Sequence, residues 1–236
     1  IQAYGFSETG SHLVMKKYQA KEVKTKGTDI IIRNLNSGSN QLVGNVADYE
    51  FNDAGTYLAL RMDATEKLGN GVQLVNLKNN NIEVLDSDTA TYTALTWHKE
   101  KNALAFMKTT SDTSHVGETY LVFAYPDVTK TSSGKVFHQT EHNAFPKNSK
   151  IVDYAGLKWS KDGNTVFFGI KDWEIKKEEP KDTSAIARLN EGLDSTNVAV
   201  WHWKDAEIQP RQEVRKKRLL EANYLSAWHL QSGDFV

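Results

Sequence analysis

A repeated pattern, made of an aromatic residue, a short polar turn and an apolar stretch, constrains the fold of this chain most strongly. It occurs four times, and successive aromatic residues are 45, 46 and 62 residues apart. The four aromatic residues are Phe6, Phe51, Trp97 and Trp159. Internal periods of this length are typical of folds in which each unit buries its apolar face against its neighbours. The chain is therefore predicted to be a repeat protein.

Each copy of the pattern predicts a β-hairpin. The aromatic residue ends one strand and buries a large apolar area, and the polar residues after it supply turn hydrogen bonds. Gly10, Gly55 and Gly163 follow their aromatic residues by four positions, where a turn of this kind needs a residue that accepts positive φ. In the third copy Lys101 stands at that position, beside Asn102.

The period of about 45 residues matches the four-stranded blade of a β-propeller. We therefore predict an all-β fold, a β-propeller with four-stranded antiparallel blades. An all-β sandwich would also fit short strands with frequent turns, but it does not account for the near-constant period. The predicted units are about 1–46, 47–91, 92–153 and 154–223, with Val198–Trp203 as a strand of the fourth, and the start of another unit at 224–236.

The length of 236 residues is short for a whole propeller. Seven blades at this period would need about 315 residues, whereas four to five units are present here. The sequence also stops at Val236, partway through what looks like a strand pair. We expect part of a seven- or eight-bladed propeller whose open edge pairs with another copy or with further chain, because exposed edge strands invite pairing.

Composition argues against several classes of function. The chain has 29 Lys and Arg against 30 Asp and Glu, and this balance argues against coating nucleic acid. No run of 18 apolar residues is present, so no membrane span is predicted. The absence of cysteine excludes disulfides, thiolate metal sites and a cysteine nucleophile.

No catalytic residue, metal site or cofactor is predicted for this chain. The Gly-x-Ser-x-Gly nucleophile elbow does not occur, and neither do dinucleotide-binding or P-loop motifs. Ser132 and Lys135 formally match a Ser-x-x-Lys pattern but lie in a Ser/Thr-rich insertion. His138 and His142 have the spacing of a helical metal pair, but the following Asn-Ala-Phe-Pro run opposes a helix.

A propeller that is itself an enzyme, such as a lyase or glycosidase, would need carboxylates that converge on its channel. Acidic residues near the predicted strand ends are candidates for this, without assigned roles: Asp48, Asp63, Asp86 and Asp153.

Two charged stretches interrupt the repeat. Residues 172–184 are predicted to form a solvated loop, although Glu178 and Glu179 could pair with the α-amino group of a substrate. Residues 206–223 contain Pro210 followed by helix formers, which favours a helix that begins there, with an extended strand as the alternative. The basic cluster of this stretch is interpreted as a solvated face, since Glu213 and Glu221 lie within it.

The most distinctive segment resembles part of the propeller of bacterial serine peptidases of the prolyl-oligopeptidase and dipeptidyl-peptidase-IV type. A Tyr-led strand follows it after a basic stretch, at Tyr224–Leu230, as in those proteins. The resemblance covers essentially the whole chain, but the turns are shared with TolB-type and WD-type propellers. The residues that carry the resemblance are Trp201, His202, Trp203, Lys204, Asp205, Gln209 and Pro210.

The resemblance implies a two-domain parent, in which the propeller restricts entry of peptides to an α/β-hydrolase domain that holds the catalytic triad. This chain would then be the non-catalytic part, with peptide substrates and a C-terminal hydrolase domain as partners and a periplasmic or secreted location. On its own it is expected not to hydrolyse peptides. The alternative is a stand-alone WD- or TolB-like propeller that acts as a protein-binding scaffold.

Overall fold

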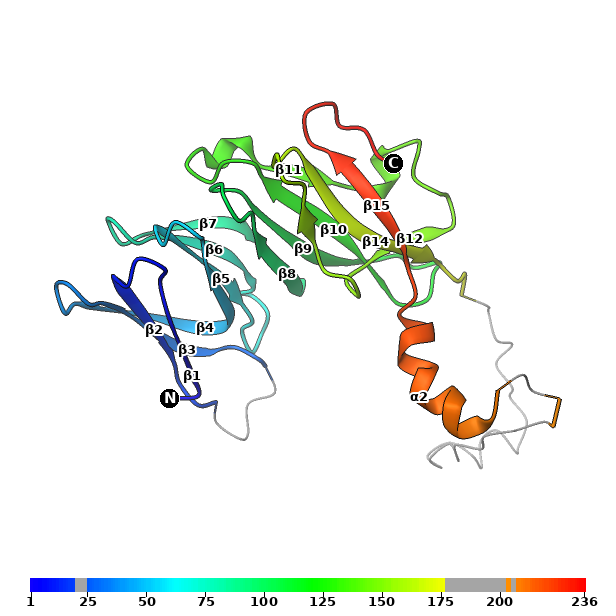
Figure 1. Ribbon diagram of the computed structural model, residues 1–236, viewed down its shortest axis with the longest axis horizontal. Coiled ribbons are helices and arrows are strands. Elements are labelled where there is room, and N and C mark those ends of the chain that lie inside the picture. The colour runs from blue at the N-terminus through cyan, green and yellow to red at the C-terminus, as the bar shows by residue number, and fades with distance from the viewer. Residues whose placement is uncertain (20–24, 177–202, 205–206) are drawn as a thin grey trace.

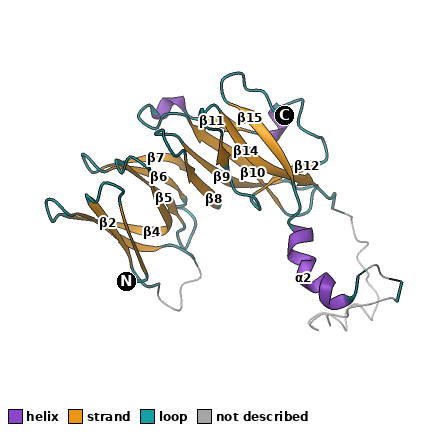
Figure 2. Cartoon of the chain, in the orientation of Figure 1, coloured by secondary structure: helices purple, strands orange, loops and turns teal. Residues whose placement is uncertain are grey.

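The computed structural model describes residues 1–19, 25–176, 203–204 and 207–236. In this part of the chain antiparallel strands form sheets that follow one another along an arc (Figure 1). Strands make up most of the regular structure, and α2 is the one long helix described (Figure 2). The fold is all-β and of the β-propeller type, as the period predicts. No helix in the described residues is long and apolar enough to cross a membrane.

The first two units share one seven-stranded sheet with the order β1 to β7. The shared strand is β4, because its first part pairs with β3 up to Val46 and its second part pairs with β5 from Val46 to Phe51. We call the two halves blade I and blade II. The strands are β1 (Ala3–Phe6), β2 (His12–Lys16), β3 (Thr28–Asn34), β4 (Asn40–Phe51), β5 (Tyr57–Met62), β6 (Gly71–Asn76) and β7 (Asn81–Ser87).

Two further sheets form blades III and IV. Blade III has the strand order β11-β10-β9-β8. In blade IV, β12 and β13 both pair with β14, one after the other, and β15 also pairs with β14. The elements are β8 (Tyr92–Trp97), β9 (Leu104–Ser111), β10 (Glu118–Tyr125), η1 (Thr131–Ser133), β11 (Lys135–Phe137), η2 (Gln139–Glu141), β12 (Ser149–Val152), β13 (Lys158–Trp159), β14 (Thr165–Asp172) and β15 (Tyr224–His229).

The pairing of β15 differs from the expectation that residues 224–236 begin another unit. Thr165 lies opposite His229 and Ile170 lies opposite Tyr224, so β15 belongs to blade IV. The strand β12 also pairs inside blade IV, although the sequence places residues 149–152 in the preceding unit. For β15 the reason is that residues 173–223 separate two neighbouring strands of one sheet in the sequence, so the strand lies outside the local period.

The helix α2 spans Gln209–Leu220 and has a proline in its first turn. The helical prediction is therefore confirmed, and the extended alternative is wrong. A proline fits there because the first N–H groups of a helix have no partner inside it. Val214 is 84% exposed, so no apolar face of α2 is buried around it.

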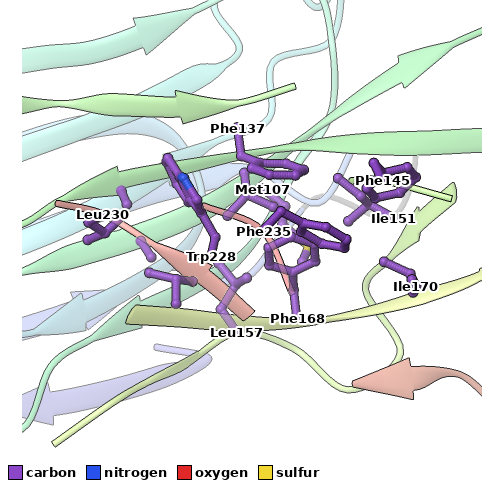
Figure 3. Close-up of a cluster of buried hydrophobic side chains, with 14 residues drawn as sticks. Met107, Phe137, Phe145, Ile151, Leu157, Phe168, Ile170, Trp228, Leu230 and Phe235 are labelled. Carbon is purple, nitrogen blue, oxygen red and sulfur yellow. The ribbon is translucent and has the colours of Figure 1, made fainter. Parts of the chain in front are cut away.

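The core of blades III and IV is rich in aromatic rings. Phe137 is fully buried at its centre, and its ring centroid lies 5.3 Å from that of Phe168 and 5.5 Å from that of Trp228. Phe235, from the last residues of the chain, packs on the same ring at 5.4 Å (Figure 3). Side chains from β11, β14, β15 and the C-terminal residues thus fix the two sheets against each other.

Candidate functional site

The repeated turns have the geometry that the sequence predicts. Gly10, Gly55 and Gly163 have φ values of 64°, 61° and 68°. Each of the three donates its N–H to the carbonyl three residues earlier, at 2.8 to 2.9 Å. Lys101 is not among the described residues with positive φ, so the third turn closes without one. We call the end of the sheets that carries these turns the turn face.

A repeated indole hydrogen bond joins successive blades. Trp97 of blade III donates its Nε1–H to the carbonyl of Glu50 in blade II at 2.9 Å. Trp159 of blade IV donates its Nε1–H to the carbonyl of Thr96 in blade III at 3.2 Å. The acceptor Glu50 directly precedes the repeat aromatic Phe51, and the acceptor Thr96 directly precedes the repeat aromatic Trp97. Trp97 and Trp159 therefore join successive blades, whereas Phe6 and Phe51 lack the N–H to make this bond. Phe6 is also 56% exposed, so the expectation that each repeat aromatic buries a large apolar area is wrong for the first copy.

A cavity lined by charged residues lies at the opposite end of the strands. Tyr92 begins β8, Glu118 begins β10, and Arg61 lies near the end of β5, while the turns lie at the other ends of these strands. The cavity has a volume of about 570 Å³, and we call it the junction cavity. Its lining comes from all four blades: Thr25, Lys26, Arg61, Asp63, Ala64, Thr65, Lys67, Thr91, Tyr92, Thr93, Thr109, Glu118, Tyr120 and Asp153.

Arg61 is the least exposed cation of the junction cavity, since Lys26 and Lys67 are both exposed. Its side chain is 15% exposed, and one guanidinium N–H donates to the carbonyl of Tyr92 at 3.2 Å. Its other terminal nitrogen lies 3.9 Å from the carboxylate of Asp48. On the same side, Asp63 accepts a hydrogen bond from the backbone N–H of Lys26 at 2.9 Å. Blades I and II thus form the positively charged wall.

Glu118, Tyr120 and Asp153 form the opposite wall. Glu118 and Tyr120 are two apart on β10, so they share one face of the sheet, while Thr119 between them is buried on the other. Burial raises the pKa of Tyr120 well above its usual value, and the charge of Asp153 and a hydrogen bond with it add to the shift. The Tyr120 hydroxyl is therefore neutral and beside a carboxylate.

An ion cluster under the cavity fixes Tyr92. Lys108 Nζ lies 3.1 Å from Asp86 and 2.7 Å from Asp88, which joins blade III to the end of β7 in blade II. The Tyr92 hydroxyl donates to the Asp86 carboxylate. Burial and this hydrogen bond raise the pKa of Tyr92 well above its usual value. The wall of the cavity at Tyr92 is thus held by contacts from two blades.

The four acidic residues near the predicted strand ends do not converge as a set. Asp63 and Asp153 line the junction cavity on opposite walls, Asp48 pairs with Arg61, and Asp86 lies under Tyr92. Sequence reasoning missed Arg61, Glu118 and Tyr120. Glu118 and Tyr120 lie on either side of Thr119 in one strand, so a two-residue alternation could have placed both side chains on the same face of the sheet.

The other sequence candidates have different roles or lie outside the described residues. His138 Nδ1 accepts the backbone N–H of Thr140 at the start of η2, and His142 stacks on Phe137 with centroids 4.1 Å apart. No group of three potential metal ligands lies together in the described part of the chain. Glu178, Glu179, Trp201, His202 and Asp205 lie outside the described residues.

The described end of the distinctive segment lies on the surface. Trp203 is 76% exposed, and Lys204 Nζ lies 5.1 Å from the centroid of its ring. Gln209 and Pro210 begin α2. The predicted strand Val198–Trp203 falls almost wholly outside the described residues.

A second cavity opens on the turn face between blades III and IV. It has a volume of about 530 Å³, and Trp97, Leu157 and Trp159 form its apolar part. A smaller cavity of about 170 Å³, lined by Phe51 and Trp97 among others, occupies the equivalent position one blade earlier. These two cavities lie at equivalent positions of successive blades, so they are a property of blade packing.

Comparison with solved structures finds proteins of several kinds that are similar in fold. The dipeptidyl peptidase 4 of Porphyromonas gingivalis matches with a TM-score of 0.54 and 11% identity, over 73% of this chain and 29% of that one. The β-propeller domain of the trilobed protease from Pyrococcus furiosus matches with a TM-score of 0.41 and 13% identity, over 68% of this chain and 45% of that one. TolB from Acinetobacter baumannii matches with a TM-score of 0.37 and 15% identity, over 72% of this chain and 41% of that one. No family profile and no curated protein sequence matches the chain.

These comparisons show the fold alone. The fold is of the β-propeller type. More particularly, 73% of the chain is similar in fold to part of the Porphyromonas gingivalis dipeptidyl peptidase 4. The chain spans less than half the length of each of these three proteins.

Proposed function

We propose that this chain is the non-catalytic propeller part of a serine peptidase of the prolyl-oligopeptidase type, which admits and positions peptides for an α/β-hydrolase domain. The observation that carries the proposal is the junction cavity, with charged residues from all four blades at one end of the sheets. The Trp201–Pro210 segment and the arrangement of the blades support the same function. A periplasmic or secreted location belongs to this proposal.

The cavity suits unfolded peptide better than a folded protein. Its volume of about 570 Å³ is in the range of sites that hold small ligands, which are about 300–1,000 Å³. Carboxylates and cations on opposite walls can pair with charged peptide groups, and the threonine hydroxyls can exchange hydrogen bonds with peptide bonds. The chain supplies binding and orientation, and the hydrolase domain supplies the chemistry.

The proposal is tested with the purified 236-residue chain and fluorescent unstructured peptides of eight to twelve residues. We expect saturable binding, measured by fluorescence anisotropy, and intact peptides by mass spectrometry after prolonged incubation. The double variant Glu118→Gln with Asp153→Asn should weaken binding, whereas Lys99→Gln on the turn face should leave it unchanged. Peptide cleavage by the chain alone, or binding that the double variant does not alter, would refute the proposal.

A further inference from the structure

The cavity between blades III and IV on the turn face differs in charge from its counterpart one blade earlier. We call this cavity of about 530 Å³ the turn-face cavity. Its lining contains three lysines and one carboxylate, which are Lys99, Lys158, Lys161 and Glu100. The counterpart of about 170 Å³ is lined by three carboxylates and one lysine, which are Glu8, Glu50, Asp53 and Lys99. Blade packing gives both cavities their position, but of the two the turn-face cavity alone has a positively charged lining.

The floor of the turn-face cavity is apolar. Leu157 and Trp97 are buried beneath it, whereas Trp159 is half-buried. The bond from Trp159 Nε1 to the Thr96 carbonyl fixes the indole in one orientation. Aromatic rings pack favourably against an indole in offset or edge-on arrangements. The floor therefore favours a ligand with a flat apolar ring.

The wall at the turn end of the cavity is held by His98, which is buried. Its Nδ1 accepts the backbone N–H of Glu100 at 3.0 Å, so the ring proton lies on Nε2. This Nε2 lies 3.1 Å from the carbonyl oxygens of both Ser160 and Lys161 in the turn of blade IV. Because these bonds fix the two turns to each other before any ligand binds, little free energy is lost in ordering the wall.

The rim of the cavity carries the positive charge. Lys99, Lys158 and Lys161 are all exposed, and none of them forms an ion pair in the described part of the chain. Lys99 lines both cavities, so Lys158 and Lys161 make the difference between them. An exposed ion pair contributes little by itself, so a bare anion is held weakly, and the apolar floor must add to its binding.

We propose that the turn-face cavity binds a small aryl carboxylate, with its ring on the floor at Trp159 and its carboxylate at Lys158 and Lys161. The cavity volume lies within the range of about 300–1,000 Å³ that is usual for small-ligand sites. The site lies at the end of the sheets opposite the junction cavity, so this inference goes beyond the proposed function and does not depend on it.

Binding is measured by titrating the nitrogen-15-labelled full chain with 1-naphthaleneacetate and following the indole N–H signals by NMR. Variants Trp97→Phe and Trp159→Phe assign the two signals of interest. We expect both to shift with a Kd of about 1 mM, the value for a ligand of this size at ordinary ligand efficiency. The indoles of Trp173 and Trp228, which are buried elsewhere in blade IV, should not shift.

Matched ligands separate the two parts of the site. The neutral isostere 1-naphthaleneacetamide should bind about three- to tenfold more weakly, since it loses the pairing with two exposed lysines. Acetate, which has the charge without the ring, should cause no saturable shift.

A double variant tests the rim. Lys158→Gln with Lys161→Gln should weaken 1-naphthaleneacetate by about three- to tenfold and leave the amide unchanged. The control Lys78→Gln with Lys147→Gln removes the same charge from exposed positions that line neither cavity, and should leave both ligands unchanged.

The inference is wrong if the amide binds as tightly as the carboxylate, or if the rim variant and its control have equal effects. It is also wrong if the shifts occur at Trp173 or Trp228 in place of Trp97 and Trp159, or if no indole signal shifts at about ten times the expected Kd.

Discussion

The repeated indole hydrogen bond predicts a specific cost for replacing Trp97 by phenylalanine. Phenylalanine already occupies the same repeat position at Phe6 and Phe51, so the smaller ring is compatible with the turn. The variant loses the bond from Nε1 to the Glu50 carbonyl, which is 2.9 Å long, from a side chain that is 8% exposed. Such a bond contributes about 0.5–1.5 kcal/mol.

The smaller ring also leaves a cavity, which costs about 1 kcal/mol at about 24 cal/mol per Å³. We therefore expect Trp97→Phe to lower the free energy of unfolding by about 2 kcal/mol. Trp159→Phe should cost less, about 1 kcal/mol, because its bond to Thr96 is longer at 3.2 Å and its ring is only half-buried. Because Thr96 adjoins Trp97, the two changes should not be additive.

Urea unfolding followed by both fluorescence and circular dichroism measures these costs, provided that the two transitions coincide. The slope with urea concentration should stay the same, so that the midpoint alone reports the change. A Trp97→Phe variant within 0.5 kcal/mol of the unmodified chain would refute the reasoning that the indole bond joins blades II and III.

Three further predictions concern the core, the turns and pH. Phe137→Ala should cost about 3–5 kcal/mol in urea unfolding, because its fully buried ring contacts aromatic side chains from three other segments; a cost below 2 kcal/mol would contradict this. Gly10→Ala should lower the free energy of unfolding by about 1 kcal/mol, because Gly10 has a positive φ and no atom near its Cβ position. Gly163→Ala should lower it by more in the same assay, because a Cβ there would lie 3.0 Å from the Lys101 side chain. Equal losses for the two variants would contradict this. Burial lowers the pKa of His12, and its buried Nε2 has no hydrogen-bond partner, so the folded chain favours the neutral ring. The free energy of unfolding should therefore fall as the pH drops below about 6.5, where the unfolded chain binds a proton at His12. His12→Phe should reduce that pH dependence in urea midpoints measured from pH 8 to 5, and an identical dependence in both chains would argue against it.

The sequence carries the blade pattern because the signal is local. An aromatic residue, a polar turn and a glycine at a fixed distance specify a hairpin whatever surrounds them, as the φ values of Gly10, Gly55 and Gly163 show. The helix after Pro210 could be predicted for the same reason, since its first-turn proline and helix formers are adjacent in the chain.

Strand pairing across the long insertion could not be predicted in this way. Tyr224 follows Asp172 by 52 residues, yet β15 pairs with β14, and the likeness of Tyr224–Leu230 to an earlier strand suggested a new unit instead. The junction cavity was also missed as a site. Arg61 lies on β5, Glu118 lies on β10 and Asp153 directly follows β12, and only the packing of the blades brings them to one place.

The account rests on peptide binding by a chain that does not cleave peptides, at the end of the sheets opposite the turns. Photo-cross-linking tests this most directly, with an unstructured peptide that carries a benzophenone side chain and mass spectrometry to locate the attachment. The account predicts intact peptide attached to segments 61–67, 91–93, 118–120 and 153. Attachment confined to the turn face, at 52–55 and 98–101, or recovery of cleaved peptide, would contradict it.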